Sequence, residues 1–74
     1  MRFGIQLRMM RALRNISQAK LAEQVGVQRH MITYIEDGIV QPNADIVARL
    51  RQALDWPAEA NAAFAMLAVE EPVE

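Results

Sequence analysis

Apolar residues near the start of the chain recur at the three- and four-residue spacing of a helix. They are Phe3, Leu7, Met10 and Leu13, and arginines occupy much of the remaining surface. This spacing places them on one face and predicts an amphipathic helix. Asn15 follows the last basic turn. Because asparagine tolerates the left-handed conformation in which helices often end, we expect this helix to stop at Asn15-Ile16.

The pattern continues with two short helices separated by a tight turn. Ser17 is a typical N-cap, and the run to about Gln24 follows, with Leu21, Ala22 and Val25 pointing inward. Gly26 then permits a backbone conformation that other residues adopt only at a cost. A third helix is expected over residues 28–36, with an inward face of Ile32 and Ile35 and with Met31 at its edge.

Two more helices complete the expected fold. Asp37-Gly38 ends the third helix, and Asn43 can cap a fourth. The apolar face of the fourth helix is expected to comprise Ile46, Val47, Leu50, Ala53 and Leu54. Pro57 suits the first turn of a fifth helix, running to about Val69. The sequence therefore predicts an all-α domain of five helices.

Residues 58–69 are almost continuously apolar, more than one helical face requires. A domain this small cannot bury all of that surface, so we expect a partner, most simply a second copy of the chain. The expected dimer interface comprises Phe64, Met66, Leu67 and Val69. The alternative is that these alanine-rich turns are simply exposed, since alanine has a high helix propensity.

Composition agrees with a single small helical domain. The chain has 74 residues, 53% of them hydrophobic and only 5% aromatic, and it has no cysteine. We therefore expect one domain over residues 1–69, stabilised by packing alone, followed by an acidic, frayed tail over residues 70–74. No apolar run approaches the roughly 20 residues that span a bilayer, so we expect a cytoplasmic protein.

Charge is distributed unevenly along the chain. The net charge is −1, which by itself argues against a nucleic-acid partner. However, residues 1–30 contain six arginines and lysines against Glu23 alone, whereas residues 31–74 contain two arginines against eight acidic residues. A basic half can face phosphate groups while the acidic half faces solvent or a partner. The alternative is an ordinary scatter of surface charge.

The string SQAKLAEQVGVQRHMITYIEDGIVQP, from Ser17 to Pro42, resembles the phage-repressor-like (Cro/C1, XRE-type) helix-turn-helix proteins. The resemblance extends from Phe3 to about Phe64. It implies a compact lambda-repressor-like DNA-binding domain, with the helix-turn-helix unit at residues 17–37 and the third helix in the major groove of double-stranded DNA. Met31 and Tyr34 are bulkier than is usual for the family on that helix.

The resemblance also assigns roles to individual residues. Base reading is implied for the outward side chains of the third helix, which are Gln28, Arg29, His30, Thr33 and Tyr34. Arginine suits this role because it can donate two parallel hydrogen bonds to guanine. Phosphate contacts are expected at the starts of two helices, from Ser17, Gln18, Gln41 and Asn43. A structural ion pair is implied between Arg11 and Glu36, while Arg8, Arg14 and Lys20 are expected to form a solvated, steering surface.

Other classes of function are less well supported by the residues. The chain has one histidine, no carboxylate pair at catalytic spacing and no phosphate-cradling glycine loop, so we expect neither an enzyme nor a metal or cofactor site. The expected function is transcriptional regulation, as a homodimeric repressor. A protein-interaction module that uses the apolar C-terminal segment remains an alternative, as does an antitoxin-type subunit that holds a toxin or an anti-repressor.

Overall fold

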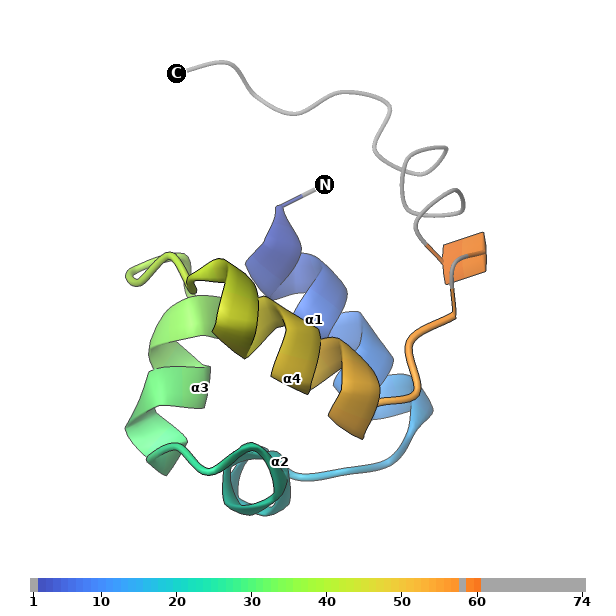
Figure 1. Cartoon of the computed structure of the whole chain (residues 1–74), viewed down its shortest axis with the longest axis horizontal. Helices are drawn as coiled ribbons and strands as arrows, with labels where there is room; N and C mark the ends of the chain where they lie inside the picture. The colour runs from blue at the N-terminus through green and yellow to red at the C-terminus, as the bar shows by residue number, and fades with distance from the viewer. Residues whose placement is uncertain (1, 58, 61–74) are drawn as a thin grey trace.

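The computed structural model describes residues 2–57 and 59–60, which form four α-helices and no β-strand. The helices are α1 (Phe3–Leu13), α2 (Gln18–Val25), α3 (Arg29–Glu36) and α4 (Ala44–Ala53) (Figure 1). The all-α prediction is therefore correct for this part of the chain. Most of the expected fifth helix lies outside the described residues, as do the acidic tail and the expected dimer contacts Phe64, Met66, Leu67 and Val69.

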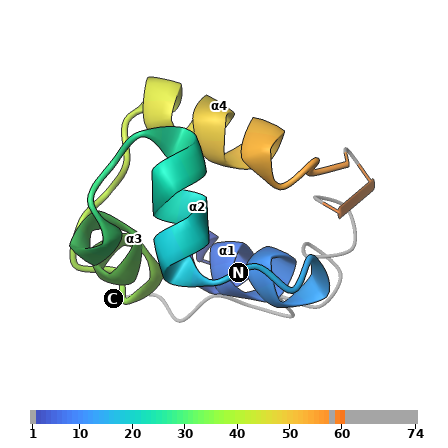
Figure 2. The same cartoon turned by 90° about the horizontal axis from the view of Figure 1, so that it is seen from below.

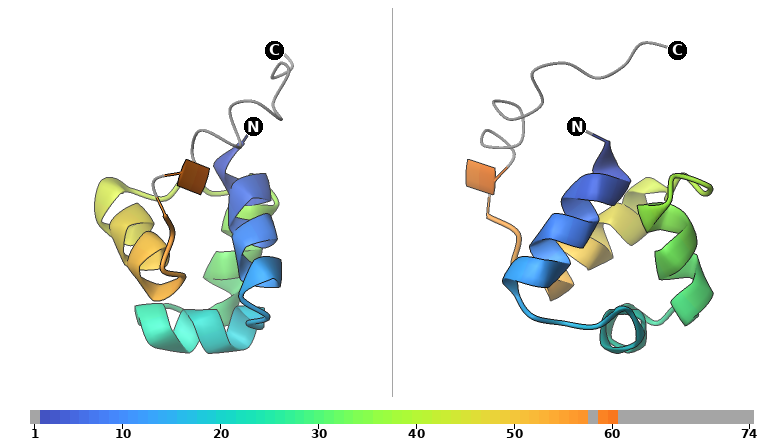
Figure 3. Two further views of the ribbon diagram at one scale, coloured as in Figure 1. Left: turned by 90° about the vertical axis from the view of Figure 1, so that its right-hand side faces the viewer. Right: turned by 180° about the vertical axis from the view of Figure 1, so that it is seen from behind.

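The helices are arranged around α2. Figure 2 shows α2 crossing between α1 on one side and α4 on the other. It packs against α3 and α4, and α1 packs against α3. As a result, α3 lies at an edge of the molecule, as seen both from the front in Figure 1 and from behind in Figure 3.

All four helices contribute to one hydrophobic core. Its buried members are Leu7, Met10, Leu21, Ala22, Val25, Ile32, Ile35, Leu50 and Leu54. The expected inward positions of α2 and α3 are confirmed, and Met31 lies at the core's edge, partly buried. Burial of this apolar surface is the main stabilising contribution, since the chain contains no cysteine. No helix among the described residues is long and apolar enough to cross a membrane.

The expected inward face of α1 is wrong at its last position. Leu13 is 73% exposed, whereas Leu7 and Met10 are buried. A helix turns by about 100° per residue, so each step of three residues falls about 60° short of a full turn. After two such steps, from Leu7 to Met10 and from Met10 to Leu13, the side chain of Leu13 no longer points to the side of the helix that Leu7 occupies. The residue four after Met10 is Arg14, and its guanidinium reaches α4: Nε donates to the Leu54 carbonyl (2.8 Å) and Nη2 to that of Asp55 (2.7 Å).

At its start, α1 lies very close to the last turn of α3. A Cβ atom at Gly4 would overlap the backbone carbonyl groups of Ile35 and Glu36. Only glycine therefore allows the two backbones to approach this closely. This contact fixes the C-terminal end of α3 against the body of the domain.

The helix ends follow the sequence signals closely. Ser17 accepts a hydrogen bond from the Lys20 amide (3.0 Å), and Asn43 accepts one from that of Ile46 (2.9 Å), so both act as the expected N-caps. Asn15 follows α1 with φ 55°, the left-handed conformation that its position predicts. Gly26 ends α2 with φ 82°. Some boundaries differ slightly: α1 ends at Leu13 and α2 at Val25. α3 begins at Arg29, because Gln28 has an extended backbone (ψ 149°) and serves as the N-cap.

After α4 the chain turns back along α1. The Trp56 ring stacks on that of Phe3, with centroids 5.7 Å apart, and the Arg51 guanidinium lies 5.6 Å from the Trp56 ring. Ala60 also packs against the core. Residues 54–56, which follow α4, therefore contact both ends of α1: Leu54 and Asp55 bind Arg14, and Trp56 stacks on Phe3.

Candidate nucleic-acid interface

The outer face of α3 presents polar and aromatic side chains to solvent. Gln28, Arg29 and His30 are exposed, Tyr34 is 41% exposed, and Thr33 is partly buried. The His30 and Tyr34 rings meet edge to face, with centroids 5.5 Å apart. Arg29 forms no hydrogen bond or ion pair through its side chain with any residue that the structure describes. Its guanidinium donors are therefore available to a ligand.

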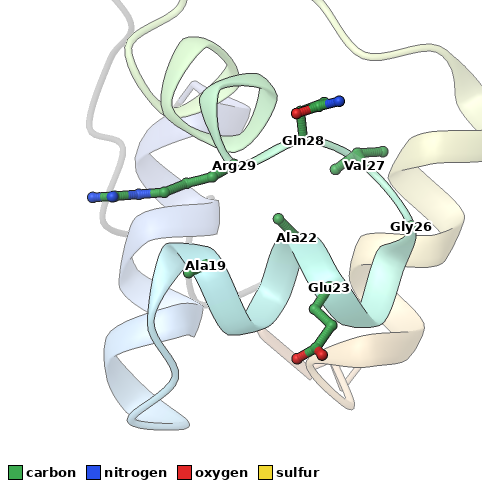
Figure 4. Close-up of a pocket in the computed structure, with 7 residues that line it drawn as sticks. All are labelled: Ala19, Ala22, Glu23, Gly26, Val27, Gln28 and Arg29. Atoms are coloured by element: carbon green, nitrogen blue, oxygen red, sulfur yellow. The ribbon is translucent and has the colours of Figure 1, made fainter.

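The turn between α2 and α3 borders a shallow hollow (Figure 4). Its lining residues are Ala19, Ala22, Glu23, Gly26, Val27, Gln28 and Arg29. The Arg29 side chain is extended and points away from Gln28, on the side of the turn where Ala19 lies. A second hollow, bordered by Arg11, Ser17, Gln18, Ala19 and Arg29, joins the start of α2 to the start of α3. The N-terminal ends of these two helices thus form one continuous surface.

The four expected phosphate-contact residues lie at the starts of α2 and α4. The side-chain oxygens of Ser17 and Asn43 already accept backbone amide protons as caps. The Gln41 side chain is exposed just before α4, and that of Gln18 is partly buried. Backbone amides in the first turn of each helix remain available to an anion, together with the helix dipole.

The structure brings Arg11 and Glu36 together inside the domain. Glu36 is only 4% exposed, and its carboxylate accepts two hydrogen bonds from Arg11, one from Nε (2.8 Å) and one from Nη2 (3.3 Å). Arg11 Nη1 also donates to the Ile16 carbonyl (3.1 Å). A buried carboxylate requires such partners because burial removes its hydration. The pair joins α1 to the end of α3.

Gln18 and Thr33 extend this pair into a network. Gln18 Nε2 donates to Glu36 Oε1 (3.0 Å), and the Thr33 hydroxyl donates to Gln18 Oε1 (3.0 Å). Among the described residues that are not exposed, no buried side-chain polar atom lacks a partner. We call these four residues, Arg11, Gln18, Thr33 and Glu36, the junction network. It links α1, α2 and α3.

Other cations expected to be solvated have partners within the domain. Arg8 lies 3.2 Å from the Asp37 carboxylate and 3.6 Å from that of Glu36. Arg14 is bound to the end of α4, as described above, and Lys20 lies 3.6 Å from Glu23 in an exposed pair. All three residues are exposed, as expected of a solvated surface, although Arg8 and Arg14 also have partners within the domain. Carboxylates therefore lie beside Arg8, Arg11 and Lys20, whereas Arg14 binds neutral carbonyls and keeps its net charge.

Sequence reasoning did not find the contacts of Gln18 with Glu36 and Thr33, nor those of Arg14 with α4. A signal existed for the first set: Thr33 and Glu36 are three residues apart, so they share a face of α3. No comparable signal existed for Arg14, because its partners are backbone carbonyls 40 and 41 residues away. The described residues contain no group of three or more metal-ligating side chains.

Comparison with known proteins agrees with this architecture. No curated protein matches the chain. Residues 2–64 match a family described as the helix-turn-helix domain. That range includes α1 to α4 and is most of the 74 residues. The match is consistent with the resemblance to Cro/C1, XRE-type proteins seen in the sequence, and the chain belongs to the helix-turn-helix domain family.

Proposed function

We propose that this protein binds specific sequences of double-stranded DNA as a transcriptional regulator, acting as a repressor. In this proposal α3 lies in the major groove, where Gln28, Arg29 and His30 meet base edges. Tyr34 meets a thymine methyl group or a sugar one turn further on. Backbone amides at the starts of α2 and α4 contact phosphates. The protein acts through binding and not through catalysis.

The observation that carries the proposal is the outer face of α3. This helix lies at an edge of the molecule, joined to α2 by the Gly26 turn, and its first turn exposes Arg29 and His30. A helix with side chains is about 10–12 Å across, and the major groove is about 12 Å wide. A helix held at the edge of a packed domain can therefore enter the groove without rearrangement.

We further propose that two copies bind together in the cytoplasm. Dimeric helix-turn-helix proteins read two half-sites about 34 Å apart, one helical turn of DNA. The apolar segment that contains Phe64, Met66, Leu67 and Val69 is proposed to join the copies. This arrangement predicts that the preferred DNA site is a palindrome.

Selection of bound duplexes from random-sequence DNA, followed by gel-shift titration, tests the proposal. We expect Arg29→Ala to weaken binding to the selected duplex by about 1–3 kcal/mol and to relax preference at one guanine per half-site. The matched control is Arg49→Ala, because Arg49 is an exposed arginine paired with Asp45 within α4. Full affinity and unchanged preference in Arg29→Ala would show that Arg29 does not read DNA.

A second function is favoured by the charge pattern. Arg8 and Arg11 have carboxylate partners within the domain, and the net charge is −1, and both features weaken the electrostatic attraction to DNA. This observation suits a protein-interaction module that does not bind DNA and holds another protein through the C-terminal segment. An antitoxin-type subunit, which would bind DNA and also hold a toxin or an anti-repressor, belongs with the DNA-binding proposal.

Salt dependence separates the two functions. A DNA-binding protein loses affinity as salt rises, with a log–log slope of about −0.9 for each phosphate neutralised. A module that binds only proteins should show no duplex binding, even in dilute salt. Titrations of the selected duplex at several salt concentrations therefore decide between them.

A further inference from the structure

We propose that the side chain of Gln18 is a positioning residue for DNA reading, which acts by holding α3 and not by contacting a phosphate. This inference rests on the proposed function and concerns the same surface. The proposal concerns the side chain of Gln18 alone. The backbone amide of Gln18, at the start of α2, can still donate a hydrogen bond to a phosphate.

Both ends of the Gln18 side-chain amide are engaged by α3. Nε2 donates to the Glu36 carboxylate (3.0 Å), and Oε1 accepts from the Thr33 hydroxyl (3.0 Å). An ionised carboxylate can only accept hydrogen bonds, so the amide nitrogen must face Glu36 and the amide oxygen must face Thr33. The orientation of the amide is therefore determined by its partners.

This arrangement gives α3 two attachment points about one turn apart. Thr33 and Glu36 lie at positions i and i+3 on the same face of the helix, and one side chain from α2 reaches both. Packing of Ile32 and Ile35 and the close approach at Gly4 already hold α3 against the domain, and the two polar contacts add a directional restraint. Two contacts, together with the Arg11 pair on the same carboxylate, resist both rotation and tilt.

The attachment lies directly beside the proposed base-reading residue. Arg29 lies one helical turn before Thr33, and the Thr33 hydroxyl also donates to the Arg29 carbonyl oxygen, at 3.5 Å. A change in the angle of α3 would move the Arg29 side chain relative to the bases. Gln18 can therefore affect sequence reading without touching DNA.

A double-mutant cycle on the full-length chain tests this proposal. Gln18→Ala, Thr33→Val and the double variant are titrated with the duplex recovered by selection and with a mixed-sequence duplex of equal length. We expect each single variant to lose affinity for the selected duplex by about five- to tenfold. The double variant should be no weaker than Gln18→Ala, because both substitutions remove the same hydrogen bond.

The mixed-sequence duplex distinguishes positioning from phosphate contact. Loss of a phosphate contact weakens binding to all sequences about equally. Loss of positioning should lower the ratio of specific to non-specific affinity and leave the non-specific affinity nearly unchanged. The matched control is Gln24→Ala, an exposed glutamine of the same helix, which should alter neither duplex affinity.

Several results would overturn the proposal. The positioning role would be rejected if the losses of affinity in the two single variants multiplied in the double variant, or if both duplexes lost affinity equally. It would also be rejected if Gln18→Ala bound the selected duplex with unchanged affinity. None of these results would contradict the proposed DNA binding. Absence of duplex binding by the unaltered protein would instead reject the proposed function itself. Circular dichroism checks folding. If Gln18→Ala does not fold, Thr33→Val decides alone, since an unchanged specificity ratio in that variant contradicts positioning.

Discussion

The inner face of α3 carries Ile32, Ile35 and Glu36, all buried, whereas its outer face carries the exposed side chains of Arg29, His30 and Tyr34. The charged groups on the two faces differ in whether they have partners within the domain. The inner carboxylate is paired with Arg11 and bound by Gln18, but the guanidinium of Arg29 has no partner among the described residues. An eight-residue helix therefore combines a structural site with a proposed binding site, and substitutions should separate stability from DNA affinity.

Among substitutions in α3, the largest effect is expected from Glu36→Ala on the inner face. Removing a buried carboxylate leaves Arg11 partly buried without its charged partner, and this should lower the free energy of unfolding by about 3 kcal/mol. Urea denaturation followed by circular dichroism measures the change. The control is Asp37→Ala, whose pair with Arg8 is exposed and should contribute under about 1 kcal/mol. Equal effects of the two variants would contradict the distinction between buried and exposed pairs.

Gly4→Ala tests whether the inner face depends on close contact with α1. A methyl group at this position would overlap the last turn of α3, at a cost of about 1–3 kcal/mol that the better helix propensity of alanine only partly offsets. We therefore expect a net loss of unfolding free energy in urea denaturation. Stabilisation by the substitution would mean that the two backbones are further apart than described.

His30→Ala tests the outer face. Because His30 is exposed, the free energy of unfolding should change by less than about 0.5 kcal/mol, while affinity for the selected duplex should fall by about 1 kcal/mol. Thermal unfolding and gel-shift titration measure the two quantities. Gln52→Ala, an exposed position on α4, serves as the control. A loss of stability without a loss of affinity would show that the outer face is structural as well.

The smallest effect is expected from Leu13→Ala. Together with Met10→Ala it compares an exposed and a buried side chain of α1. Leu13 is 73% exposed, so its truncation should change the free energy of unfolding by less than about 0.5 kcal/mol. Met10→Ala, at a buried position of the same helix, should cost about 2–5 kcal/mol. Similar losses for both variants would indicate that another surface covers Leu13 in solution.

Most of the helical architecture could be predicted because its signals are local. The caps at Ser17 and Asn43, the left-handed residue Asn15 and the Gly26 turn each depend on backbone groups within a few residues. Helical periodicity also identified the buried positions of α2 and α3. It failed at Leu13, because a short run of apolar residues does not determine which way a helix faces.

For the four described helices, the sequence by itself determined the boundaries to within about two residues, the order of the helices and the set of polar side chains on α3. Only the tertiary structure decided which charged side chains form ion pairs or hydrogen bonds within the domain. Arg8, Arg11, Arg14 and Arg29 are chemically identical, and their roles differ because packing brings three of them to carboxylates or carbonyls distant in the chain. Long-range proximity depends on how whole helices pack, and local sequence signals do not encode it.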